Sequence, residues 1–202
     1  MRIGIDFGTT NSAVAVVDGQ GRARILELFP GEPLQRTVIH CDPRGVLRFG
    51  NAGFRQYVDT DLDGRLLRSL KSFLSQDVPR TSIGGRRYAF TELVTLYLRF
   101  LVRETERVTG QEVTEVVLGR PVHFNEDRSR DAFALDQLQG AIADAELPRC
   151  RLRLEPVAAA YAWEQTLDAE RRVLVGDFGG GTADFAVLRV GPQRRGRAVR
   201  TD

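Results

Sequence analysis

The chain has 202 residues, of which 42% are hydrophobic and 28% are charged, a composition typical of a globular protein that can bury a core. Its 29 basic and 27 acidic residues leave a formal net charge of +2, too balanced to indicate nucleic acid or an anionic membrane as a partner. Asp6 interrupts the first apolar stretch, and no apolar run approaches the roughly 18 residues that span a bilayer, so we expect a cytoplasmic location.

The first 90 residues read as strands followed by mixed, irregular sequence. Strands are predicted at 2–6, 13–18 and 24–28, with a hairpin turn at 18–21. The stretch from about 30 to 90 is rich in Gly, Pro and Asp, which indicates an inserted subdomain. Within it we expect strands at 37–40 and 46–49, a helix at 51–58, and a turn with a strand at 82–90.

From residue 91 onward, apolar residues recur with a helical period until Gly110. The core-facing residues of this helix are predicted to be Leu93, Tyr97, Phe100, Leu101 and Val108. A second helix is predicted from Glu126 to about Ala145, with Asn125 as its N-cap. The other expected elements are strands at 115–119 and 151–154 and an Ala-rich helix that opens with Glu155-Pro156.

A similar six-residue pattern occurs twice, each time on a turn between two predicted strands. The copies are Asp6-Phe7-Gly8-Thr9-Thr10-Asn11 and Asp177-Phe178-Gly179-Gly180-Gly181-Thr182. Gly and small hydroxyl residues let backbone N–H groups converge on an anion, because no Cβ blocks the approach. An Asp beside phosphates is favourable only when a cation such as Mg²⁺ lies between the negative groups. Two such turns on two related lobes predict a phosphate clamp, with Asp6 and Asp177 as metal ligands.

Other phosphate-binding signatures do not fit these residues. A P-loop requires Lys and then Ser or Thr after its second glycine, whereas Gly181 is followed by Thr182-Ala183-Asp184. Protein kinases also contain Asp-Phe-Gly, but residue 6 leaves no room upstream for their glycine-rich and catalytic loops. The remaining alternative is a pair of ordinary glycine-rich hairpins.

The basic residues are unevenly divided between their two types. Of the 29, 28 are Arg and only Lys71 is Lys. A flexible ammonium can approach a γ-phosphate and an attacking water as a point charge, which a planar guanidinium cannot imitate. Lys71 is therefore either retained by chance or needed as Lys.

Taken in order along the whole chain, these motifs resemble the heat-shock protein 70 chaperones of the DnaK type. Residues 3–12 resemble the first phosphate motif of that family, and residues 176–184 resemble the second. The intervening similarities are 70–74 with the segment of the catalytic Lys, 118–125 with a strand, proline and helix start, and 155–160 with a Glu-Pro-x-Ala-Ala-Ala stretch. The residues at 71–74 and 119–121 look most like the sequences of a shorter bacterial subgroup that lacks the peptide-binding domain.

The resemblance implies an α/β fold of the actin-like (ribonuclease H-like) ATPase type, with ATP and Mg²⁺ as ligands. Residues 1–170 would form lobe I, including the insertion at about 30–90, and residues 171–202 would be the first hairpin of a truncated lobe II. The full-length protein would hydrolyse ATP to ADP and phosphate, whereas we expect weak binding and negligible hydrolysis from this piece. A peptide or protein client would bind through regions beyond the chain.

The resemblance also implies individual roles. Lys71 would place the attacking water, and Glu155 and Asp184 would orient metal-bound or attacking water. Pro121 matches a proline that links nucleotide state to lobe rotation, but Ser129 stands where that family has its Arg partner. Phosphate would be held by Gly8, Thr9, Thr10, Asn11, Gly179, Gly180, Gly181 and Thr182, with Thr9 also implied in catalysis, and Mg²⁺ by Asp6 and Asp177.

Two further functions stay open on sequence grounds. A sugar or small-molecule kinase of the same superfamily would need an Asp base and a sugar-contacting set rather than Lys71. A nucleotide-sensing scaffold or filament protein would need no catalytic residue.

Overall fold

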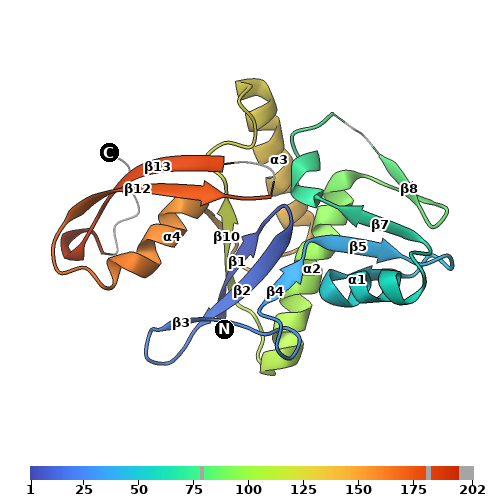
Figure 1. Ribbon diagram of the computed structural model, residues 1–202, viewed down its shortest axis with the longest axis horizontal. Coiled ribbons are helices and arrows are strands. Elements are labelled where there is room, and N and C mark those ends of the chain that lie inside the picture. The colour runs from blue at the N-terminus through green and yellow to red at the C-terminus, as the bar shows by residue number, and fades with distance from the viewer. Residues whose placement is uncertain (78–79, 181–182, 196–202) are drawn as a thin grey trace.

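The computed structural model describes residues 1–77, 80–180 and 183–195, and its centre is a six-stranded mixed sheet (Figure 1). The strand order is β11-β10-β1-β2-β3, and β4 also pairs with β2. β1 and β10 are parallel, as are β10 and β11, whereas β2 is antiparallel to its neighbours. The strands are β1 (Arg2–Phe7), β2 (Asn11–Val17), β3 (Ala23–Ile25), β4 (Leu34–Arg36), β10 (Glu115–Arg120) and β11 (Arg151–Leu154).

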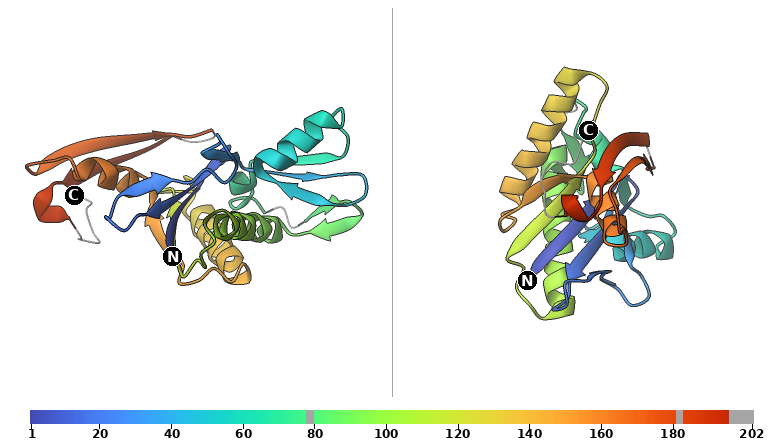
Figure 2. Two further views of the ribbon diagram at one scale, coloured as in Figure 1. Left: turned by 90° about the horizontal axis from the view of Figure 1, so that it is seen from below. Right: turned by 90° about the vertical axis from the view of Figure 1, so that its left-hand side faces the viewer.

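The two faces of the central sheet differ because side chains alternate along each strand. In β1, Ile3, Ile5 and Phe7 are buried in the main core, whereas Gly4 and Asp6 lie on the opposite, open face. The core side is covered by α2 (Phe90–Thr109) and α3 (Arg128–Asp144), which lie together on one side of the sheet (Figure 2). The open face is therefore available for a site.

Helix α2 follows its predicted bounds, and Gly110 ends it with a left-handed φ of 66°. One member of its predicted apolar face is wrong, because Val108 is exposed while Leu98 is buried. The predicted start of α3 is also wrong. The Asp127 side chain, not Asn125, caps this helix by accepting hydrogen bonds from the backbone N–H groups of Ser129 and Arg130.

The insertion between β4 and α2 contains a three-stranded sheet in the order β6-β5-β7, with helix α1 packed beside it. Strands β4 and β7 and the short 3₁₀ helix η1 were not predicted from the sequence. The elements are β5 (Val38–Cys41), β6 (Leu47–Phe49), α1 (Gly50–Asp59), β7 (Arg65–Arg68), η1 (Leu70–Phe73), β8 (Thr81–Ile83) and β9 (Arg86–Tyr88).

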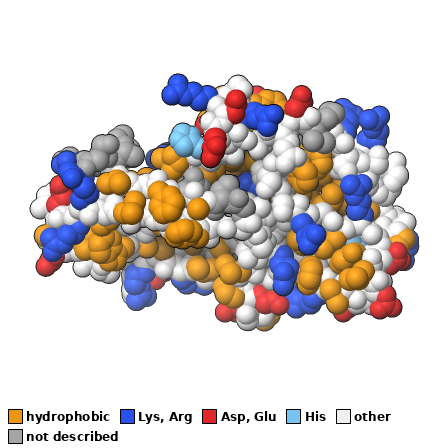
Figure 3. Space-filling model, turned by 45° about the horizontal axis from the view of Figure 1, so that its top comes forward, with side chains coloured by type: hydrophobic (Ala, Val, Ile, Leu, Met, Phe, Trp, Pro, Cys, Tyr) orange, Lys and Arg blue, Asp and Glu red, His pale blue; other side chains and the backbone are white. Residues whose placement is uncertain are grey.

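The last part of the chain is a long antiparallel hairpin of β12 (Arg171–Phe178) and β13 (Ala183–Val190), followed by η2 (Pro192–Arg194). One face of the hairpin packs on α4 (Glu155–Glu164) around a small separate core. The opposite face of the hairpin exposes hydrophobic side chains, which lie close together on the molecular surface (Figure 3). They are Leu174, Phe178, Phe185 and Val187. No helix in the described ranges combines the length and apolarity needed to cross a membrane.

Candidate functional site

The first repeated turn connects β1 to β2 and requires glycine at position 8, directly after β1. A Cβ on Gly8 would lie 2.2 Å from the carbonyl oxygen of Asn11, a backbone atom that cannot move away without opening the turn. The carbonyl of Thr10 accepts a hydrogen bond of 2.8 Å from the N–H of Thr37, which anchors the turn to the segment between β4 and β5. Thr9 is half-buried and Thr10 is exposed. The turn thus has a fixed backbone and accessible threonines.

The second repeated turn connects β12 to β13 and lies against the first. A Cβ on Gly180 would be 2.0 Å from Oγ1 of Thr10, so the two turns meet at this point. Gly179 and Gly180 are both exposed. Gly181, Thr182 and the side chain of Asp184 lie outside the described residues, although Asp184 pairs with Asp177 in the register of the hairpin.

Three predicted carboxylates line one cleft of about 440 Å³ between the open face of the central sheet and β12. Asp6 comes from β1, Asp177 from β12, and Glu155 from the first residue of α4. Lys71 reaches the same group from η1, where its Nζ donates a hydrogen bond of 2.7 Å to Oε1 of Glu155. The Lys71 and Glu155 side chains are only 12% and 15% exposed. Four segments that are distant in sequence therefore converge on one charged cluster.

The carboxylates in this cluster are electrostatically coupled. Burial raises the pKa of Glu155 above its ordinary value, and the nearby negative charges of Asp6 and Asp177 add to that increase, while Lys71 opposes it. The pKa of Asp6 is also raised, chiefly because surrounding protein atoms desolvate its carboxyl, even though the residue remains accessible from the cleft. Lys71 lowers the pKa of Asp6 and Asp177 raises it. Such a cluster gains stability when a cation enters it.

A family model described as Hsp70 protein matches residues 71–196, more than half of the chain. The chain belongs to the Hsp70 family. Membership indicates an ATP-binding, chaperone-type domain and part of an actin-like ATPase fold. The matched region begins at Lys71 and includes Glu155, Asp177 and the second turn.

The donor set suits the Mg²⁺·ATP that Hsp70 proteins bind. Within the described part of the chain, no group of three or more His, Cys, Asp or Glu side chains is arranged to enclose a metal ion. Mg²⁺ does not require such a cage, because it usually keeps several waters and takes one or two carboxylates together with substrate phosphates. Asp6 and Asp177, on different hairpins, supply two carboxylates to the cleft near the two repeated turns.

The contacts around Pro121, the residue for which the sequence predicts an allosteric role, are made by neighbouring residues in this Hsp70-family chain. The backbone N–H and the hydroxyl of Ser129 both donate hydrogen bonds to the carboxylate of Asp127. Pro121 is buried directly after β10. Arg120 donates hydrogen bonds of 3.0 and 3.1 Å to the carbonyls of Pro121 and Val122. The sequence analysis missed this contact, although an Arg directly before the proline was its visible signal.

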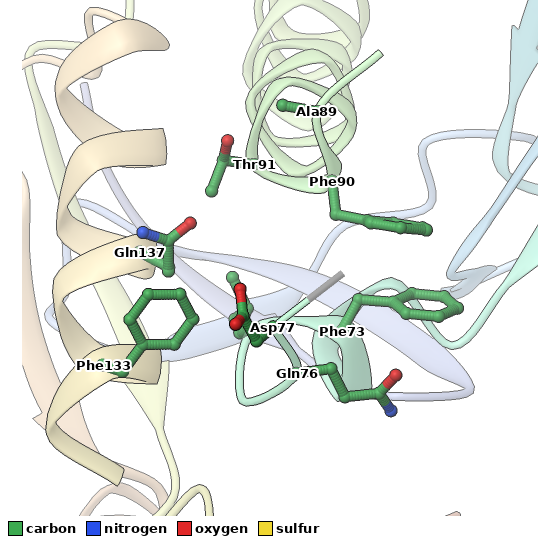
Figure 4. A pocket seen from close by; sticks show the side chains of 9 residues that line it. Phe73, Gln76, Asp77, Ala89, Phe90, Thr91, Phe133 and Gln137 are labelled. Atoms are coloured by element: carbon green, nitrogen blue, oxygen red, sulfur yellow. The ribbon is translucent and has the colours of Figure 1, made fainter. Parts of the chain in front are cut away.

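A second, smaller pocket of about 80 Å³ lies between η1, α2 and α3 (Figure 4). The Phe73 and Phe90 rings stack there with centroids 4.1 Å apart. None of the predicted site residues lines this pocket. The two stacked rings pack η1, the element that carries Lys71, against the start of α2.

Proposed function

We propose that this chain supplies the phosphate-binding and water-positioning residues of an Hsp70-type ATPase, which converts ATP and water into ADP and phosphate in the full-length protein. The observation that carries the proposal is the ion pair between Lys71 and Glu155, because Glu155 lines one cleft together with Asp6 and Asp177. Hydrolysis of this type depends on positioning and charge neutralisation, which is what such a cluster provides.

Each residue of the cluster has a distinct task in this proposal. Asp6 and Asp177 would hold hydrated Mg²⁺, which neutralises charge on the phosphates. Lys71 holds an ammonium where an attacking water and the γ-phosphate would meet, and Glu155 fixes that ammonium through the 2.7 Å hydrogen bond. Thr9, Thr10, Asn11, Gly8, Gly179 and Gly180 would surround the phosphates from the two turns, together with Gly181 and Thr182.

We further propose that residues 1–170 form one lobe and that 171–202 begin a second, related lobe. The supporting observation is that both repeats take the same form, an antiparallel hairpin with Asp near the end of its first strand. The local sequence around Lys71 and Pro121 supports membership in a short bacterial subgroup that lacks the peptide-binding domain. Asp184 is proposed to help orient water, as the resemblance implies.

The deciding experiment compares ATP turnover of the full-length protein with that of its Lys71→Ala variant, using Arg68→Ala as the matched control. Arg68 is an exposed basic residue three positions away. We expect Lys71→Ala to lower turnover by on the order of a hundredfold, as loss of one preorganised charge does, and Arg68→Ala to leave it unchanged. Unchanged turnover in Lys71→Ala would contradict the role of Lys71. Transfer of the γ-phosphoryl group to a sugar, giving ADP and a sugar phosphate without free phosphate, would indicate the kinase alternative. No turnover in any form would indicate a scaffold.

A further inference from the structure

Gly119, which lines the cleft, lies against the side chain of Glu155, the hydrogen-bond partner of Lys71. A Cβ at this position would lie 3.1 Å from Cγ of Glu155 and 3.5 Å from its Oε1. The first separation is shorter than ordinary van der Waals contact between carbon atoms. The Glu155 side chain therefore lies directly over Gly119, in the space that any other residue would fill.

The route of the chain explains why the contact arises. β10 and β11 are parallel, and Gly119 pairs with Arg153 in their register. Glu155 follows β11 as the first residue of α4, so its side chain passes beside β10 on the open face of the sheet. Its Oε1 meets Nζ of Lys71 at 2.7 Å.

Gly4 provides an internal comparison. It lies on the neighbouring strand β1 and lines the same cleft, yet a Cβ there would meet nothing within 4 Å. Neither glycine has a backbone conformation that side chains avoid, because neither φ is in the left-handed region. Backbone conformation therefore does not explain why position 119 is glycine. The space that the Glu155 side chain occupies above it does.

We propose that Gly119 is a positioning residue, whose missing Cβ leaves the space in which Glu155 lies and reaches Lys71. Its importance for nucleotide hydrolysis rests on the function proposed above, but the positioning itself is a property of the protein alone. A side chain at 119 pushes the Glu155 side chain aside and so weakens its hydrogen bond to Lys71.

The single Lys in the sequence makes this testable without nucleotide. Protein carrying ¹⁵N-labelled Lys gives one side-chain ammonium signal, and its protons exchange slowly with water when they are held in a shielded ion pair. We expect exchange to be about tenfold faster in Gly119→Val, as for loss of one charge-assisted hydrogen bond. Gly119→Ala should show a smaller increase, and Gly4→Ala should match the wild type. Far-UV circular dichroism of each variant checks the fold, and Gly119→Ala carries the test if the valine variant does not fold.

The outcomes separate this inference from the proposed ATPase. Equal exchange in Gly119→Val, Gly119→Ala and wild type overturns the positioning role, as does a wild-type Lys71 signal that exchanges as fast as free lysine. Faster exchange in the Gly119 variants alone supports it. If that result is accompanied by no binding of Mg²⁺·ATP to the full-length wild type, the positioning role stands and the ATPase proposal fails.

Discussion

Replacing Lys71 with Met removes the ammonium while keeping most of the side-chain volume, and it leaves the Glu155 carboxylate without its partner. The lost hydrogen bond is 2.7 Å long and joins side chains that are 12% and 15% exposed. A hydrogen bond between charged groups contributes about 1.5–3 kcal/mol, and leaving one charge of a buried pair unpartnered costs about 3–5 kcal/mol. Residual water contact and proton uptake by Glu155 reduce that cost. We therefore expect Lys71→Met to lower the free energy of unfolding by about 2 kcal/mol near neutral pH.

The pH dependence of that loss follows from the pKa of Glu155. Burial already raises this pKa in the folded protein, and removing Lys71, which lowers it, raises it further. An acid whose folded pKa exceeds its unfolded value contributes stability at low pH that is lost as the pH rises through the folded pKa. The penalty of Lys71→Met should therefore be small near the ordinary Glu value of 4.5 and should grow at higher pH.

Urea unfolding at several pH values measures this directly, for the wild type, Lys71→Met, Glu155→Gln and the double variant. Because the two side chains contact each other, the double variant should lose clearly less stability than the sum of the single losses. Additive losses that do not change with pH would refute the reasoning, because they would show that the two charges do not interact in solution.

Three other predictions test separate parts of the structure. Gly8→Ala should destabilise the protein by about 1–3 kcal/mol in thermal unfolding, because its Cβ would lie 2.2 Å from the Asn11 carbonyl oxygen. Gly19→Ala, whose Cβ would have no atom within 4 Å, should have little effect. Equal effects of the two substitutions would contradict a steric clash at Gly8. Asp127→Ala should lower the free energy of unfolding in urea by about 1 kcal/mol, because it removes the N-cap of α3. A larger decrease from Asn125→Ala would show that Asn125 is the more important capping residue. Burial raises the pKa of the Cys150 thiol to about 11 and also raises the pKa of Cys41, so both should react slowly with a thiol reagent near neutral pH until the protein is unfolded; rapid reaction of the folded protein would contradict this.

The helix and strand pattern was largely predictable where local sequence decides it. The α2 period, its stop at Gly110 and the two repeated hairpins follow from residue spacing and turn chemistry. The N-cap of α3 was not, since Asn125 and Asp127 are both good capping residues and lie two positions apart. The structure uses both, because Asn125 accepts the N–H of Asp127 in the turn that precedes the helix. Sequence alone does not rank these two hydrogen bonds.

Four of the predicted site residues lie together in the structure, but the contacts that hold them there were not predictable from the sequence. Lys71 lies on η1, which follows Ser69 in a left-handed conformation with φ of 57°, and no residue pattern announces that turn for a serine. The role of Gly119 depends on a side chain 36 positions away that meets it only because β10 and β11 pair. Such contacts are decided by tertiary packing rather than by local sequence.

The only Lys of the sequence occupies a more enclosed position than the Arg side chains of two other ion pairs. Lys71 keeps only 12% of its side chain exposed, against 25% for Arg194 and 33% for Arg48 in their ion pairs. A guanidinium has five N–H donors in a rigid plane, and burying it at this depth would require partners for all of them. An ammonium is smaller, and after binding Glu155 it keeps further N–H donors beside the cleft that Asp6 and Asp177 line. Small size and remaining donors are thus properties that an ammonium has at this position and a guanidinium does not.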